Sequence, residues 1–214
     1  MVKFFVQKGA DLNRRSNTNK WSVVYIAATL GDTATLQYLI GLGCEVNAQT
    51  SMKRNALTKA CWVNRHDSVR ILLKHPNINL EHKANADRTA LQMAVWGPFG
   101  GRQARKMGVN PYDSPECVQL LLDAGADPNS RDTKGKSCLH TACQTGGERS
   151  IPLLLKYGTD INARTLRGST PLHTCFYFGN IGPLKQLLEF RPDPESKFAK
   201  AIQVLDTAAV FMDE

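Results

Sequence analysis

The feature that most constrains the fold of this chain is a short motif that returns at a nearly constant interval. The segments SVVYIA, NALTKA, TALQMA, SCLHTA and TPLHTC align on the last residue of each, Ala27, Ala60, Ala94, Ala142 and Cys175. Subtracting these positions gives intervals of 33, 34, 48 and 33 residues. A second series, rich in paired leucines, follows in the same register from Leu39, Leu72, Leu121, Leu154 and Leu187. Two series that share one period indicate a single repeated structural unit.

This unit resembles the ankyrin repeat, which has about 33 residues arranged as helix, turn, helix and β-hairpin finger. The resemblance covers nearly all of residues 1–191, although only Thr170-Pro171-Leu172-His173 is the complete starting motif. The second unit has HPNIN where glycine is usual, and the last unit lacks the finger glycine. The resemblance implies an all-α fold, a solenoid of stacked helix-turn-helix units with β-hairpin fingers.

We expect an ankyrin-repeat domain over residues 1–195 and a C-terminal capping helix over 196–214. The domain starts with a half-repeat, 1–17, because VKFFVQKGADLN has the pattern of a second helix and finger without a first helix, which leaves a face exposed. The full repeats are expected at about 18–50, 51–84, 85–132, 133–165 and 166–195. The capping segment has an apolar stripe typical of an amphipathic helix, and a helix that docks on a partner is the alternative. The stripe consists of Phe198, Ile202, Leu205, Ala209 and Met212.

Each expected first helix is preceded by a side chain that can accept hydrogen bonds from the unpaired amides of a first turn. These side chains are Ser22, Asn55, Thr89, Ser137 and Thr170. Thr89 and Gln92 have the spacing of a capping box, and His140 and His173 occupy the same third helical position. Glycines suited to a left-handed helix end follow three of the second helices, at Gly43, Gly125 and Gly158.

The pair His173 and Cys175 also raises the alternatives of a thiolate nucleophile or a zinc site. Both residues fall on repeat positions that hold ordinary packing and capping residues elsewhere, which favours a structural role. Zinc ligands must converge to about 2.0–2.3 Å from one ion, whereas equivalent positions of stacked helices lie about 8–10 Å apart. The six scattered cysteines are expected to be free thiols. We therefore predict no enzymatic activity, no cofactor and no metal.

Aromatic residues gather at the first-helix positions that, by the family resemblance, usually contact partners. Large rings at such positions are favoured binding anchors, and the alternative is that they pack on neighbouring repeats. Phe176, one residue before the last pair, is expected in the core. The predicted partner-facing residues are Thr29-Leu30, Trp62-Val63, Trp96-Gly97, Gln144-Thr145 and Tyr177-Phe178.

Basic residues fall in or beside the expected fingers, at Arg54, Arg88, Lys134 and Lys136, with Trp21 at the equivalent place in the first full repeat. The net charge of +8 also favours an acidic partner. The long interval reflects an insertion at 97–115, which contains three further candidate contacts, Arg102, Arg105 and Lys106. Such a loop either grips a partner or is a tolerated insertion.

These features together predict a non-enzymatic protein-interaction scaffold or adaptor. Its partner would be a protein with an acidic face or an acidic peptide, bound in an aromatic concave groove beside basic finger tips. The alternatives are a nucleic-acid-binding module that uses the basic fingers and an accessory recruiting subunit of an enzyme complex. No stretch approaches the roughly 20 apolar residues of a membrane span, so no membrane partner is expected. We expect a cytoplasmic subunit of a larger assembly, with a nuclear or cytoskeletal location left open.

Overall fold

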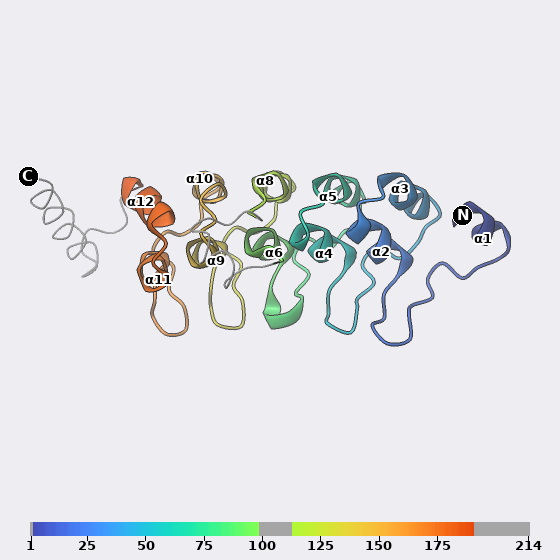
Figure 1. Ribbon diagram of the computed structural model, residues 1–214, viewed down its shortest axis with the longest axis horizontal. Coiled ribbons are helices and arrows are strands. Elements are labelled where there is room, and N and C mark those ends of the chain that lie inside the picture. The colour runs from blue at the N-terminus through green and yellow to red at the C-terminus, as the bar shows by residue number, and fades with distance from the viewer. Residues whose placement is uncertain (1, 99–112, 191–214) are drawn as a thin grey trace, which may run out of the picture.

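The computed structural model describes residues 2–98 and 113–190, and the regular elements of these two ranges are all helices. The helices form two rows, with finger-like loops projecting beyond the first row (Figure 1). The inner row contains α2 (Val23–Leu30), α4 (Ala56–Trp62), α6 (Ala90–Trp96), α9 (Cys138–Thr145) and α11 (Pro171–Phe178). The outer row contains α3 (Thr33–Gly41), α5 (His66–Leu73), α8 (Pro115–Asp123), α10 (Ile151–Lys156) and α12 (Ile181–Glu189). The predicted all-α solenoid is confirmed, and its repeats are numbered one to five by their inner helices.

The inner helices begin at the predicted residues because a side chain caps each first turn. Ser22, Asn55, Thr89, Ser137 and Thr170 each accept a hydrogen bond from the backbone N–H three residues later. In the last four repeats the third helical residue completes a capping box. The third residues of repeats three and four also reach the next repeat: Gln92 Nε2 donates to the carbonyl of Lys136, and His140 Nε2 donates to the carbonyl of Ser169.

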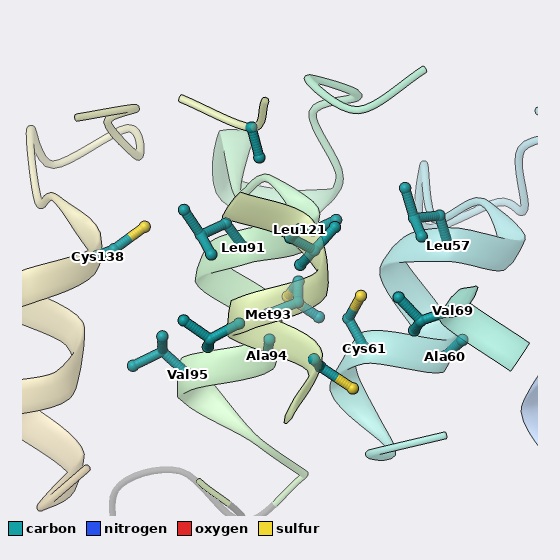
Figure 2. Packing of buried hydrophobic residues seen from close by; sticks show 14 of the residues in the cluster. Leu57, Ala60, Cys61, Val69, Leu91, Met93, Ala94, Val95, Leu121 and Cys138 are labelled. Carbon is teal, nitrogen blue, oxygen red and sulfur yellow. The ribbon is translucent and has the colours of Figure 1, made fainter. Parts of the chain in front are cut away.

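Packing between successive inner helices forms a continuous hydrophobic core (Figure 2). Small residues such as Ala60 and Ala94 let the helices approach, while Leu57 and Leu91 fill the space between them. All six cysteines are buried free thiols. Burial of apolar area stabilises a fold by about 25 cal/mol per Å². Because much of this area is buried between repeats, each repeat depends on its neighbours for stability.

The prediction that Phe176 lies in the core is wrong, because its side chain is 52% exposed. The equivalent residues of the four earlier repeats are buried, since a following inner helix covers each of them. These are Ala28, Cys61, Val95 and Cys143. In the described part of the chain the stack ends at repeat five, so the same position faces outward there.

The fingers are hairpin turns that contain no strand within the described residues. Each turn is closed by backbone hydrogen bonds, as between the N–H of Thr165 and the carbonyl of Ser169, which are 2.9 Å apart. Neighbouring fingers are also joined, because the N–H of Leu166 donates to the carbonyl of Lys134 at 3.1 Å. The tips share one left-handed position, occupied in turn by Lys20, Lys53, Asp87, Gly135 and Gly168. A 3-10 turn, η1 (Asn85–Asp87), forms the tip of the third finger.

The half-repeat at the start contributes α1 (Val2–Gln7), which precedes the first finger. The predicted capping helix at 196–214 lies outside the described residues, as do Arg102, Arg105 and Lys106 of the insertion. The described parts of the insertion are its first residues after α6 and its last residues before α8. Their contacts are given with the candidate site.

Candidate functional site

A row of three cations, Arg54, Arg88 and Lys136, crosses the middle repeats at the base of the fingers. Each of them directly precedes the N-cap residue of an inner helix. The repeat therefore places them at one position in three successive units. We call these three residues the cation row, and its neighbours in the same register are Trp21 at one end and Ser169 at the other.

Each member of the cation row contacts the side chain of the residue eight positions later, near the end of the inner helix that follows. The Arg54 guanidinium carbon is 4.4 Å from the ring centroid of Trp62, and that of Arg88 is 3.9 Å from the centroid of Trp96. In repeat four the Lys136 ammonium donates to Oε1 of Gln144 instead. These contacts arise because the chain leaves the finger and turns into the helix. Cation and ring attract each other through the ring quadrupole, which holds both side chains in place.

Two additional side chains join the row to its surroundings. The Lys59 ammonium lies 4.1 Å from the centroid of Trp62, so this indole contacts two cations. The Lys136 ammonium also lies 5.9 Å from the ring of Phe178, which belongs to the next repeat. The predicted basic and aromatic residues of repeats two to four are thus brought together on one surface. We call this surface, formed by the cation row with Lys59, Trp62, Trp96, Gln144 and Phe178, the finger face.

Positive charge on the finger face lacks salt-bridge partners among the described residues. The pKa of Arg88 is lowered, chiefly by burial and also by the nearby charge of Arg54, while the Asp132 carboxylate acts in the opposite direction. Burial is also the first cause of the lowered pKa of Lys136. Asp132 is the acidic group that acts on both cations, but its Oδ1 already accepts the backbone N–H groups of Lys134 and Lys136 at 2.8 and 2.9 Å.

Arg54 also has a buried hydrogen-bond donor without an acceptor. Its Nε is shielded from solvent and has no hydrogen-bond acceptor in the described structure. A buried donor without an acceptor is costly, because it has lost its water and gained nothing in exchange. The cation row is therefore partly desolvated and has no salt-bridge partner among the described residues.

Trp62 and Trp96 occupy equivalent positions but differ in what holds them. Trp62 packs against the edge of the hydrophobic core, and its Nε1 donates to the carbonyl of Gly97 at 2.8 Å. Trp96 makes neither contact among the described residues, and both rings are half-buried. The sequence left open whether such a ring binds a partner or packs on the next repeat. Trp62 packs on the next repeat through Nε1 and also contacts two cations through its ring.

The remaining predicted residues lie at the margins of the finger face. Trp21 is 43% exposed and stacks on Tyr25 with ring centroids 6.0 Å apart. Tyr177 is 82% exposed and meets Phe178 edge to face at 5.0 Å. Val63 is half-buried and Lys134 is exposed. Exposed rings therefore lie at both ends of the row.

The structure also shows what anchors the insertion, which the sequence did not reveal. Its first residue, Gly97, is bound by Trp62, and Ser114, near its end, donates through Oγ to Oδ1 of Asn64 at 2.5 Å. Both anchors lie at the end of α4, beside the finger face. Asp113 accepts the backbone N–H of Ser150 at 3.0 Å and thereby caps α10 of the fourth repeat.

The thiols and histidines have the structural positions expected from the repeat. Burial raises the pKa of Cys117 to about 11 and raises the pKa of Cys61 well above its usual value, which disfavours thiolates. Within 2–98 and 113–190, no three His, Cys, Asp or Glu side chains gather as metal ligands would. Likewise, no helix in these ranges has the length and apolar character needed to cross a bilayer.

An apolar hollow of about 410 Å³ lies at the N-terminal end, where the sequence predicted an exposed face. Its walls come from the half-repeat and from repeat one, and include Val6, Leu12, Ile26 and Leu30. Ile26 and Leu30 occupy helix α2. The hollow is distant in sequence from the cation row and has no cation in its lining.

Comparison with known proteins gives a uniform result. The family model for ankyrin repeats matches three times, over residues 1–84, 26–101 and 107–197. The chain is 28% identical over 147 residues to the putative ankyrin repeat protein YahD of Escherichia coli strain K12, which covers 69% of this chain and 68% of that protein. It is 27% identical over 161 residues to mouse rabankyrin-5, covering 69% of this chain. A match to neurogenic locus notch homolog protein 1 of Danio rerio has 24% identity over 142 residues and covers 66% of this chain. The matched regions make up only 12% of rabankyrin-5 and 5% of the notch homolog.

Proposed function

This chain belongs to the ankyrin-repeat family, and we propose that it is a non-enzymatic scaffold that binds an acidic protein segment on its finger face. Ankyrin repeats generally mediate protein–protein interactions. The observation that carries the proposal is the cation row, three half-buried cations in successive repeats without a salt-bridge partner in the described structure. Surface cations without a salt-bridge partner favour an anionic partner.

The two components of the finger face suit different parts of such a partner. The cations attract carboxylates over a distance and raise the rate of association. The exposed rings at the ends of the row, Trp21 and Tyr177, can bury apolar area at a small cost in side-chain entropy and would hold aliphatic side chains of the partner. In this proposal Lys134 and the insertion residues Arg102, Arg105 and Lys106 extend the basic surface, and the chain recruits its partner as a cytoplasmic subunit of a larger assembly.

Nucleic acid is the second candidate, favoured by the net charge of +8 and by the unpaired cations. Single-strand binders stack bases on open aromatic faces. On the finger face Arg54 and Lys59 lie over Trp62, and Arg88 lies over Trp96. Covered rings are poor stacking platforms, so a protein partner fits this surface better than a nucleic acid.

The test compares captured proteins between a row variant and a control with the same change in charge. The row variant is Arg54→Gln with Arg88→Gln, and the control is Arg70→Gln with Lys185→Gln, two exposed cations of outer helices. Captures from native lysate, with and without nuclease, are quantified by mass spectrometry. We expect a nuclease-resistant protein that the wild type and the control retain and the row variant loses. Equal retention by all three proteins would contradict the proposed function, and loss on nuclease treatment would favour nucleic acid.

A further inference from the structure

We infer that the cation row recognises an extended segment with a carboxylate at every third residue, so that each of three successive repeats takes one acidic side chain. This inference rests on the proposed function and specifies the chemistry of the partner. It follows from the register of Arg54, Arg88 and Lys136, which the repeat places once per unit. A ligand that uses all three cations must repeat at the same interval.

The interval is set by the stacking of the inner helices. Helices α4, α6 and α9 contact one another in sequence, and packed helix axes lie about 8–10 Å apart. An extended segment in the polyproline II conformation has three residues per turn and rises about 3.1 Å per residue, so residues three apart share one face and lie about 9 Å from each other. Carboxylates at positions i, i+3 and i+6 of such a segment therefore match the row.

A helical ligand would need a much longer segment to reach the same three cations. With a rise of 1.5 Å per residue, about seven residues separate side chains that are 10 Å apart along a helix. Three contacts would then require about fifteen ordered residues, against about seven in the extended form. Because each ordered residue loses conformational entropy, the extended segment is favoured.

The two arginines are prepared to bind carboxylates in a defined geometry. A guanidinium presents its N–H groups in a planar fork that matches the two oxygens of a carboxylate. The contacts of Arg54 with Trp62 and of Arg88 with Trp96 restrain these forks before a ligand arrives. A restrained fork loses less entropy on binding than a mobile side chain does.

The ends of the row limit the acidic run to three positions. In the same register the first repeat has Trp21 and the fifth has Ser169, with the exposed Tyr177 eight residues later. Neither register position carries a charge, so the row itself offers no cation to a fourth carboxylate. An apolar side chain three residues beyond either end of the acidic run would meet a ring.

Synthetic peptides can test the register directly. One labelled peptide has glutamates at positions 1, 4 and 7 of a neutral Gly/Ser/Ala frame, and a second has the same composition with three adjacent glutamates. Fluorescence anisotropy at low salt gives each Kd. We expect the spaced peptide to bind about tenfold more tightly, because one or more charge-assisted hydrogen bonds is lost when the spacing is wrong. A third peptide with glutamates seven residues apart reports on the helical alternative.

Variants show whether the cation row is responsible. Arg88→Gln should weaken the spaced peptide about tenfold, and Arg88→Lys should weaken it less, because charge is kept while the planar fork is lost. Arg70→Gln, on the outer helix α5, should leave both peptides unchanged. Thermal melting of each variant separates a binding defect from unfolding.

Each remaining outcome has a definite meaning. Equal binding of the spaced and adjacent peptides, with both lost in Arg88→Gln, would overturn the register while leaving the scaffold proposal standing. Tighter binding of the seven-residue spacing would overturn the extended form in favour of a helix. Binding of both peptides that no row variant alters would remove the cation row from the site, and a tighter oligothymidylate with a steep salt dependence would favour nucleic acid. Failure of the proposed function is read separately, from the captured proteins.

Discussion

Repeats two and three differ from repeats four and five on the finger face, while their buried residues are nearly interchangeable. In repeats two and three an arginine lies on a tryptophan, through the pairs Arg54–Trp62 and Arg88–Trp96. In repeat four the pair becomes Lys136 with Gln144, and in repeat five the two positions hold Ser169 and Tyr177. The buried leucines of the inner helices, in contrast, recur in all four repeats as Leu57, Leu91, Leu139 and Leu172. Packing and recognition therefore use different positions of one repeat.

The largest effect should come from the shared core, and it should be similar in both halves. Leu91→Ala and Leu139→Ala each remove a fully buried side chain, and each should lower the free energy of unfolding by about 2–5 kcal/mol. Leu166→Ala, at an exposed finger tip, is the control and should change it by less than about 0.5 kcal/mol. Urea unfolding followed by circular dichroism measures all three. A large cost in only one half would show that the two halves are not equivalent scaffolds.

The next effect should separate the two tryptophans of repeats two and three. If both rings anchor a partner, Trp62→Ala and Trp96→Ala should each cost about 2 kcal/mol of binding free energy. Trp62→Ala should also lower the melting temperature, because it removes core contact and the hydrogen bond to Gly97. Trp96→Ala should change melting less. Calorimetry with the captured partner and thermal melting on the same proteins provide both quantities.

Association rates and affinities measured at several salt concentrations can sharpen the contrast against nucleic acid. With a protein ligand, Arg54→Gln and Arg88→Gln should mainly slow association and reduce its salt sensitivity. With nucleic acid, the salt slope should fall by about one unit for each phosphate contact removed. Unchanged affinity in folded Trp62→Ala and Trp96→Ala proteins would assign these rings to packing alone.

Much of the fold could be predicted because the repeat makes each structural signal appear several times. The N-cap residues and the glycines at helix ends have local causes, and Ser137 or Gly158 acts in the structure as its position in the repeat indicates. Phe176 was placed wrongly because burial at that position comes from the next repeat, a property that no single repeat contains. The anchors of the insertion escaped prediction for a related reason. Trp62–Gly97 and Asn64–Ser114 join residues 35 and 50 positions apart, with no sequence signature.

The candidate site could be predicted only in part. The sequence placed Arg54 and Trp62 on one surface, but not the direct contact between them, which depends on how the finger turns into the helix. The desolvation of Arg88 and the occupied Oδ1 of Asp132 likewise depend on three-dimensional packing. The type and register of a residue can be read from the sequence, whereas its burial and its contacts arise only when the repeats pack together.

A smaller effect should distinguish two finger tips that share one backbone conformation. Gly135 and Gly168 both have φ near +75°, at 73° and 78°. Gly168→Ala should cost about 1–2 kcal/mol of unfolding free energy from backbone strain alone, because its added Cβ meets open space. Gly135→Ala should cost more, since its Cβ would lie 2.9 Å from the backbone nitrogen of Leu166 in the next finger. Lys53→Gly, at the same register, should be neutral or stabilising, and equal costs for both glycines would contradict the contact between fingers.

The smallest effect is a pH dependence of the unfolding free energy, which His140 should cause in repeat four and a histidine at position 92 should add in repeat three. Burial is the first cause of the lowered pKa of His140, whose neutral ring accepts the N–H of Ser137 at Nδ1 and donates to the carbonyl of Ser169 from Nε2. A histidine with a lowered folded pKa stabilises the protein fully above its unfolded pKa of about 6.5, and this stability is lost as pH falls below that value. Gln92 makes the equivalent contact in repeat three without titrating. His140→Gln should therefore stay within about 1 kcal/mol of wild type at pH 8 and lose part of the decline in unfolding free energy between pH 7 and 5. The control Gln92→His should steepen that decline, and parallel pH profiles for all three proteins would show that the buried histidine does not govern it.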